Sequence, residues 1–224
     1  RETQFPFARR SRLSPQRMRR QLRAQAEQAR RALARECTES GIEWSFEVVR
    51  GDVSARVLEE AENADLLCVG RASRPLTRRS GVGSTAIAAA GAVSRSVLLV
   101  SRDTEIKSPV VVLYDGSEEG KEALLMASRV ADHLEGLLSV VVPASAVSSS
   151  EKIQERITGE LDGEGLLVRY RELAGSGLRS LINAALTEGA GLLVLDRSYL
   201  PADRLADFVA GVDCPVLLVS RHSA

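Results

Sequence analysis

The chain has 224 residues, enough for one large domain or for two small ones that each bury a core. Thirty lysines and arginines balance thirty aspartates and glutamates, so the formal net charge is zero and no global field attracts nucleic acid or an anionic membrane. The longest apolar runs, such as VVVLY and LLSVVVP, are much shorter than the roughly 20 residues that span a bilayer. We therefore expect a globular protein with no membrane segment and no nucleic-acid partner.

Cysteine usage points to a reducing compartment. Cys37, Cys68 and Cys214 are widely spaced, and two of them lie in apolar, strand-like runs where thiols behave as small hydrophobic side chains. Their spacing suggests neither a zinc site nor a disulfide framework. We expect a cytoplasmic protein without a metal.

The first predicted element is a long amphipathic helix that ends at Gly41, because glycine commonly follows the last helical turn. Its apolar side chains recur at spacings of three or four residues: Met18, Leu22, Ala26, Ala29, Leu33 and Cys37. The polar side carries much of a cluster of ten arginines between Arg9 and Arg35. This cluster is either a solvated face balanced by acids elsewhere or a surface for an anionic partner.

The rest of the first half is predicted to alternate strands and helices. A strand begins at Trp44 (WSFEVV), a helix at Ser54 (SARVLEEAEN), and a second strand is DLLCVG. The glycine-rich loop GRASRPLTRRSGVGST follows and leads into the helical run AIAAAGAV and the strand SVLLVSR. Near-continuous Val and Leu in the strands is typical of a parallel sheet with helices on both faces.

The second half repeats this order after the polar stretch DTEIKSP. It opens with the strand VVVLY, a turn at Asp115 and Gly116, a helix and the strand LLSVVVP. It then continues with LLVRYREL, GLRSLINAALTEG, GLLVLD and finally PVLLVSR, which ends 119 residues after SVLLVSR. The repeat predicts an α/β fold of two tandem doubly wound parallel-sheet domains, residues 1–105 and 106–224. The first lacks a counterpart of the opening strand, helix and strand, Pro109 to Pro143.

These features together resemble the universal stress protein family in a tandem two-domain arrangement, from about Phe5 to Arg221. Three pieces carry the resemblance: VVVLYDGSEEGKEALLMASRVA is similar to the family's opening strand, acidic turn and first helix, ADLLCVGRASRPLTRRSGVGSTA to its fourth strand and glycine loop, and DCPVLLVS to its last strand. The resemblance implies an adenine nucleotide alpha hydrolase-like fold. It also implies that the last strands, Val97 to Ser101 and Val216 to Ser220, pair as in a homodimer, so that the tandem chain is a pseudo-dimer of its two domains, with further dimerisation left open.

The glycine loop is the candidate nucleotide site. Nucleotide-binding members of the family have Gly, two residues, Gly, nine residues, then Gly followed by Ser or Thr. Here Gly70, Gly83 and Ser84 fill three positions, and Ser73 stands where the second glycine would be. Glycines let backbone N–H groups approach phosphate oxygens, and the following helix offers its N-terminus.

Side chains of the same loop extend this candidate site. Ser84 and Thr85 are expected to donate hydroxyls and to cap the helix. Positive charge is expected from the arginines of the loop, Arg71, Arg74, Arg78 and Arg79. The segment is neither a Walker loop, which needs Lys before the Ser, nor a dinucleotide fingerprint, which would follow its strand directly.

The second half lacks this loop. Leu66 lies 36 positions before Arg102, whereas Leu192 lies 29 before Arg221, so about seven residues are missing where RSYLPADRLAD replaces the loop. The resemblance implies that Asp115, after the opening strand, contacts a nucleoside. The phosphate loop and this carboxylate thus belong to different halves.

No arrangement of residues indicates catalysis. His133 and His222 lie near no candidate nucleophile or metal ligand in sequence, and the acidic run after Tyr114 reads as a turn with Ser117 as the N-cap of a helix. We expect a regulatory or stress-response module that is not an enzyme and that binds ATP or another adenine nucleotide through the first half. The alternatives are a nucleotide-free structural or interaction module and the cytoplasmic domain of a membrane transporter.

Overall fold

The computed structural model describes residues 15–71, 83–101, 104–144, 150–161, 166–175 and 177–220. By its internal contacts the chain forms two units, Arg1–Arg50 and Gly51–Ala224. None of the helices in these described segments combines the length and apolar character needed to cross a bilayer.

Within its described residues, 15–50, the first unit contains one helix, α1 (Pro15–Ser40). It ends as predicted at Gly41, which has a left-handed backbone (φ 66°), and the N–H of Ile42 donates to the carbonyl of Cys37 at 2.9 Å. Such a turn satisfies carbonyls that the last helical turn leaves unpaired.

The strand predicted from Trp44 is absent, and this prediction was wrong. Residues 42–50 form neither helix nor strand, and the side chains of Trp44 and Val48 are exposed. The repeat gives the reason. In the second half the corresponding strand pairs with the strand Leu137–Pro143, and the described part of the first half has no counterpart of that partner. An isolated strand has no ladder to satisfy its backbone groups.

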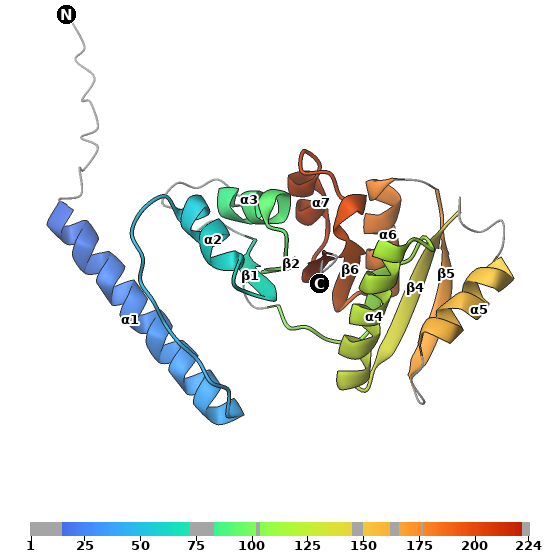
Figure 1. Cartoon of the computed structure of the whole chain (residues 1–224), viewed down its shortest axis with the longest axis horizontal. Coiled ribbons are helices and arrows are strands. Elements are labelled where there is room, and N and C mark those ends of the chain that lie inside the picture. Colours follow the sequence, from blue (N-terminus) through green and yellow to red (C-terminus); the bar gives the residue numbers. More distant parts are fainter. Residues whose placement is uncertain are drawn as a thin grey trace, which may run out of the picture. The chain divides into compact units, whose positions relative to one another are not determined.

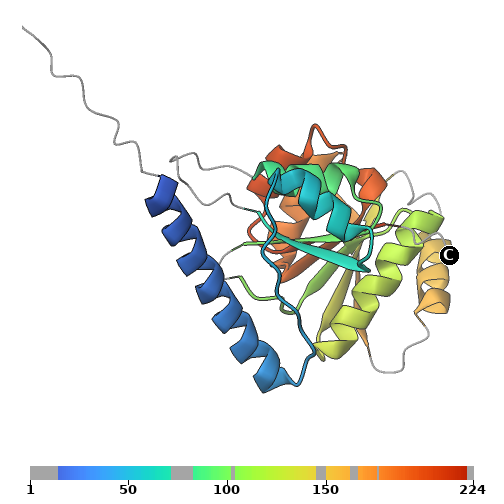
Figure 2. The same ribbon diagram turned by 60° about the vertical axis from the view of Figure 1, so that its left-hand side comes forward.

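The second unit is a seven-stranded sheet with helices on both faces (Figures 1 and 2). Its strands lie in the order β1-β2-β7-β6-β3-β4-β5. In chain order the elements are α2 (Val53–Ala61), β1 (Leu66–Gly70), α3 (Ser84–Ala92), β2 (Ser96–Val100), β3 (Val110–Leu113), α4 (Glu118–His133), β4 (Leu137–Pro143), α5 (Ser150–Glu160), β5 (Leu167–Leu173), α6 (Leu178–Glu188), β6 (Leu192–Asp196), the 3₁₀ turn η2 (Arg197–Tyr199), α7 (Leu205–Gly211) and β7 (Val216–Val219). The predicted α/β fold class is confirmed. The division into two domains at residue 105 stays a prediction, because strands from both sides of that residue belong to one sheet.

Two apolar layers sandwich the sheet. One layer joins α2, α3, α6 and α7 to one face, with Phe208 among its largest buried side chains. The other joins α4 and α5 to the opposite face, with Leu124 and Ile157. Successive residues of β3 serve the two layers in turn, since Val110 packs into the second and Val111 into the first. This alternation explains why β3 is apolar at every position.

The two halves meet at β2 and β7, which form the antiparallel pair of the sheet, and the predicted pairing of these two strands is confirmed. The register pairs Val97 with Leu218, Leu98 with Leu217 and Leu99 with Val216. In the repeat Val97 corresponds to Val216 and Leu99 to Leu218, so a local two-fold axis passes through the pair Leu98–Leu217. Strands on the two sides of this axis therefore run in opposite directions.

Candidate functional site

The base of the glycine loop is held at the carboxyl end of β1. The N–H of Arg71 donates to the carbonyl of Val100 at 2.7 Å, which continues the ladder between β1 and β2. The N–H of Gly83 donates to the carbonyl of Arg71, also at 2.7 Å, so the two ends of the loop are joined directly. Residues 72–82 between them, with the predicted site residues Ser73, Arg74, Arg78 and Arg79, lie outside the described residues.

The helix after the loop begins without a side-chain cap. Gly83 is the N-cap of α3, with extended backbone angles (φ −65°, ψ 142°), and α3 starts at Ser84. The prediction that Ser84 or Thr85 caps the helix was wrong, because both already lie within its first turn. Since glycine has no side chain, no cap hydrogen bond competes for the first N–H groups of α3, and such groups are the usual donors to a bound anion.

Space is available above Gly70. A Cβ built on this residue meets no described atom within 4 Å, and its φ is not left-handed. Neither crowding by the fold nor backbone geometry therefore requires glycine there. Close approach of a ligand to the backbone would still explain why this residue is a glycine.

Arg71 has a contact that sequence reasoning missed. Its side chain crosses to the second half, where Nη1 donates to the carbonyls of Val209 and Val212 at 3.1 and 2.6 Å and reaches that of Cys214 at 3.4 Å. The carbonyls of Val209 and Val212 lie at the carboxyl end of α7, where the helix dipole favours a cation. Burial raises the pKa of the Cys214 thiol, and the charge of Arg71 partly opposes that rise. No signal in the sequence distinguishes Arg71 from the other arginines nearby.

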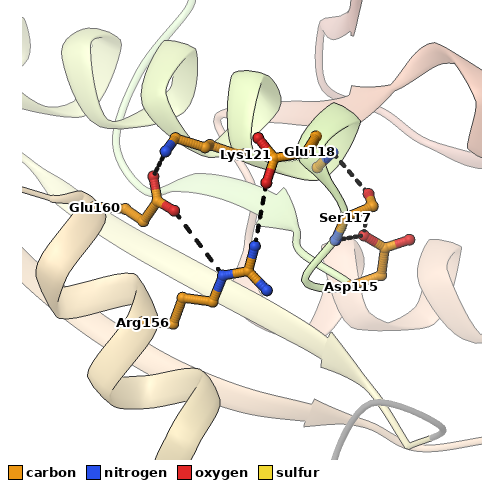
Figure 3. A network of polar contacts seen from close by, with 7 residues as sticks. Asp115, Ser117, Glu118, Lys121, Arg156 and Glu160 are labelled. Carbon is orange, nitrogen blue, oxygen red and sulfur yellow. Dashed lines mark hydrogen bonds and ion pairs between the residues drawn. The ribbon is translucent and has the colours of Figure 1, made fainter.

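Asp115 lies in a closed turn at the carboxyl end of β3 (Figure 3). One carboxylate oxygen, Oδ1, accepts hydrogen bonds from the N–H and the hydroxyl of Ser117 at 2.9 and 2.5 Å. Ser117 is the N-cap of α4, as predicted, and its hydroxyl oxygen accepts from the N–H of Gly120 at 2.9 Å. A Cβ on Gly120 would lie 2.7 Å from Oδ1, so the turn packs closely enough to need glycine there.

An ion-pair network beside this turn links α4 to α5 (Figure 3). Lys121 and Glu160 are 2.5 Å apart, and Arg156 lies 3.4 Å from Glu118 and 4.0 Å from Glu160. The hydroxyl of Tyr114 is buried and, among the described residues, has no hydrogen-bond partner. Burial is the main cause that raises the pKa of this phenol, and the charge of Arg156 opposes it. The network shows no nucleophile paired with a base.

The position that corresponds to the glycine loop in the second half is a short capped turn. Asp196 accepts hydrogen bonds from the N–H and the hydroxyl of Ser198, and η2 follows. Burial raises the pKa of the Tyr199 phenol, and the charge of Asp115 raises it further. A hollow of about 380 Å³ beside this turn is lined by both halves, Gly91, Asp196, Ser198 and Ser220 among them. A carboxylate therefore lines the place where a phosphate would sit.

Gly70 and Asp115 belong to different sites. Because β2 and β7 are antiparallel, β1 and β3 run in opposite directions, and their carboxyl ends lie at opposite ends of the strands. Three strands also separate β1 from β3. Among the described residues, no strand occupies the place beside β1 that corresponds to β3.

Comparison with known proteins gives a family match for the first half and a similar fold for the whole chain. Residues 6–101 match the model of the universal stress protein family. The structure is similar to that of a universal stress protein from Archaeoglobus fulgidus DSM 4304, with 17% identity, 96% of this chain and 83% of that chain covered and a TM-score of 0.70. A functionally unknown protein from Pseudomonas aeruginosa PAO1 is also similar, with 15% identity, coverage of 87% and 77% and a TM-score of 0.58. Curated protein sequences gave no match. Residues 6–101 are thus similar in sequence to the universal stress protein family, and the chain as a whole has the fold of that solved universal stress protein.

Proposed function

We propose that this chain is a stress-response regulatory module that binds the phosphates of ATP or another adenine nucleotide at the glycine loop of its first half. Its action is binding and not catalysis. The base of the loop is the observation that carries the proposal: Arg71 and Gly83 are joined by a hydrogen bond, and the helix N-terminus beside them is uncapped. Backbone N–H groups and a helix dipole at such a place favour an anion.

The nucleotide in this proposal is held mainly by its phosphates. Asp115, the carboxylate expected to contact a nucleoside, lies at the opposite end of the strands from Gly70. We therefore expect ATP to bind and adenosine to bind much more weakly. The second half is proposed to be empty, because Asp196 replaces glycine there and repels a phosphate.

The first experiment is to denature the purified protein and to identify released small molecules by chromatography with mass detection. Near one equivalent of adenine nucleotide supports the proposal. An empty protein whose melting temperature does not change on addition of ATP, ADP or adenosine contradicts it.

Substitution at the loop base gives a sharper test. Gly70→Val and Gly83→Val should weaken ATP binding at least tenfold, on the order of 1.4 kcal/mol, because each places a side chain where the phosphates approach the backbone. The open space at Gly70 makes the first variant the safer one for folding. Gly159→Ala is the matched control, since a Cβ there also meets nothing within 4 Å and the site is remote, on α5. Equal ATP affinity in all three variants would rule the glycine loop out.

A nucleotide-free interaction module is the second candidate. The short turn at Asp196 and the self-contained turn at Asp115 favour it, because neither needs a ligand to satisfy its polar groups. In this reading the two halves act as a pseudo-dimer whose surface binds a protein. An absence of released nucleotide together with a partner that co-purifies stoichiometrically favours this candidate.

A further inference from the structure

A second hollow, the linker hollow, lies at the amino ends of β6 and β7. It has a volume of about 380 Å³ and is bounded by the connection between the halves, the carboxyl end of α6 and the segment that joins α7 to β7. Small-molecule sites commonly have volumes of this order. The base of the glycine loop, formed by Gly70, Arg71 and Gly83, does not line it. Its lining includes Glu105, Lys107, Leu186, Asp213 and Cys214.

The equivalent place in the first half holds a guanidinium. The equivalent of Cys214 is Arg95, because each lies two residues before the valine that pairs with the second leucine of the neighbouring strand. The side chain of Arg95 extends to the carboxyl end of α2, where Nη2 donates to the carbonyl of Glu62, the C-cap residue, at 3.1 Å. The dipole of α2 favours a cation at this place. The first half therefore fills it with a side chain of its own.

The second half supplies no such side chain to the carboxyl end of α6. The last turn of α6 contains no basic residue, and Cys214 is too short to reach the helix end as Arg95 does. Arg169 and Arg171 pair with the carboxylate of Glu188 in that turn, but they come from β5 and do not line the linker hollow. Where the first half has a guanidinium, the second half thus has a hollow.

The charged residues of the linker hollow fit a ligand that carries both signs. The carboxylates of Glu105 and Asp213 line it, and so does Lys107. No ion pair between described residues joins Lys107 to either acid. The stem of Lys107 packs tightly, since its Cγ would lie 2.6 Å from a Cβ on Gly191. One positive and two negative side chains leave a net negative lining, which is complementary to a ligand with a net positive charge.

We propose that the linker hollow binds a small guanidino acid, a compound with a guanidinium at one end and a carboxylate at the other, of which free arginine is the simplest. The guanidinium takes the place that Arg95 fills in the first half, at the carboxyl end of α6 and beside Glu105 and Asp213. The carboxylate of the ligand pairs with Lys107. A guanidinium suits this place because its planar set of donors binds carboxylates and carbonyl oxygens together. The proposal does not depend on nucleotide binding at the glycine loop.

Isothermal titration calorimetry with L-arginine tests the ligand. We expect a dissociation constant on the order of 100 µM, which is modest for about twelve non-hydrogen atoms. L-Citrulline has nearly the same shape but a neutral urea group, so it should bind at least tenfold more weakly, on the order of 1.4 kcal/mol. Agmatine keeps the guanidinium but lacks the carboxylate that Lys107 binds. It should bind roughly fivefold more weakly than L-arginine, about 1 kcal/mol.

Substitutions test the place of binding. Cys214→Arg should abolish L-arginine binding, because the chain's own guanidinium then fills the linker hollow as it does in the first half. Cys214 is buried, so circular dichroism must first show that this variant folds. The double variant Glu105→Gln, Asp213→Asn changes only exposed side chains and should weaken L-arginine binding at least tenfold. Glu155→Gln is the matched control, since this carboxylate is exposed on α5, and it should leave the affinity unchanged.

The glycine-loop variant separates this proposal from the nucleotide proposal. Gly70→Val should weaken ATP binding and leave L-arginine binding as it is. Loss of L-arginine binding in Gly70→Val would place the ligand at the glycine loop and overturn the proposal.

Four further outcomes overturn it. They are no heat and no change in melting temperature with about 10 mM L-arginine, well above the expected dissociation constant, equal affinity for L-arginine and L-citrulline, equal affinity for L-arginine and agmatine, or an affinity for L-arginine that is unchanged both in folded Cys214→Arg and in the double variant.

Discussion

Arg71 shows how one side chain joins the two halves. Its guanidinium lies at the carboxyl end of α7, 2.6 Å from the carbonyl of Val212, while its backbone holds the base of the glycine loop. We expect Arg71→Ala to lower the free energy of unfolding by about 2 kcal/mol, since hydrogen bonds from a charged donor to half-buried carbonyls are lost. Urea denaturation measures this change. Arg204→Ala is the control. Arg204 is exposed and forms a surface ion pair with Asp203 at 3.6 Å, so its replacement should change the free energy of unfolding by nearly zero. Equal stability of the two variants would contradict this role of Arg71.

Glu27 on α1 gives a prediction about pH. Arg30 and Arg31 donate hydrogen bonds to its carboxylate at 2.8–3.1 Å and lower its pKa to about 2. Because this pKa lies below the ordinary value of 4.5, the interaction stabilises α1 fully above pH 4.5 and is lost as the pH falls toward 2.

Titration of the Glu27 carboxyl by NMR measures this pKa. Replacing both Arg30 and Arg31 with Gln should move the midpoint up toward 4.5, because the donors that favour the charged carboxylate are removed. Arg35→Gln should leave the midpoint where it is, because Arg35 pairs with Glu36. A midpoint that stays low in the double variant would show that the arginines are not its cause.

At the scale of elements, periodicity and the repeat predicted most of the fold. Runs of Val and Leu mark β2, β3, β4, β6 and β7 because a strand covered on both faces is mostly apolar, whereas the edge strand β5 alternates apolar and polar side chains. The segment from Trp44 has the same kind of sequence but forms no strand, because pairing depends on a partner far away in the chain. Ser117 was predictable as a cap from local sequence, whereas the contact of Arg71 with α7 was not, since it joins residues 138 to 143 positions apart.

The connection between the halves depends on close packing at Gly191. A Cβ on this residue would lie 1.9 Å from the carbonyl oxygen of Lys107, and its N–H donates to the carbonyl of Pro109 at 2.8 Å. We expect Gly191→Ala to cost at least about 3 kcal/mol, because backbone on both sides of the contact must move. Thermal unfolding measures the loss. Gly70→Ala is the control and should leave stability within about 0.5 kcal/mol, because no described atom is near. A Gly191→Ala variant as stable as this control would show that the linker adapts at little cost.

At the scale of the whole second unit, one sheet spans both halves, so they should unfold together. The pair of β2 with β7 buries Val97 completely and Leu218 almost completely, and both belong to the apolar layer that also holds α3 and α7. A residue at this junction therefore supports strands on both sides of the local two-fold axis. Cooperativity of this kind follows when no element on one side has a complete core of its own.

Val97→Ala tests this cooperativity. Removing two buried methyl groups should lower the free energy of unfolding by about 2 kcal/mol. Because the sheet is shared, we expect the amides of β1 in the first half and of β6 in the second to lose the same amount of protection in native-state hydrogen exchange. Ile157→Val is the comparison, because Ile157 is buried on α5 and far from the junction. It should lower the free energy of the same global unfolding by about 1 kcal/mol. If Val97→Ala instead accelerates exchange in β1 and β2 alone, the halves unfold separately, and the two-fold strand pair is a contact between independent domains.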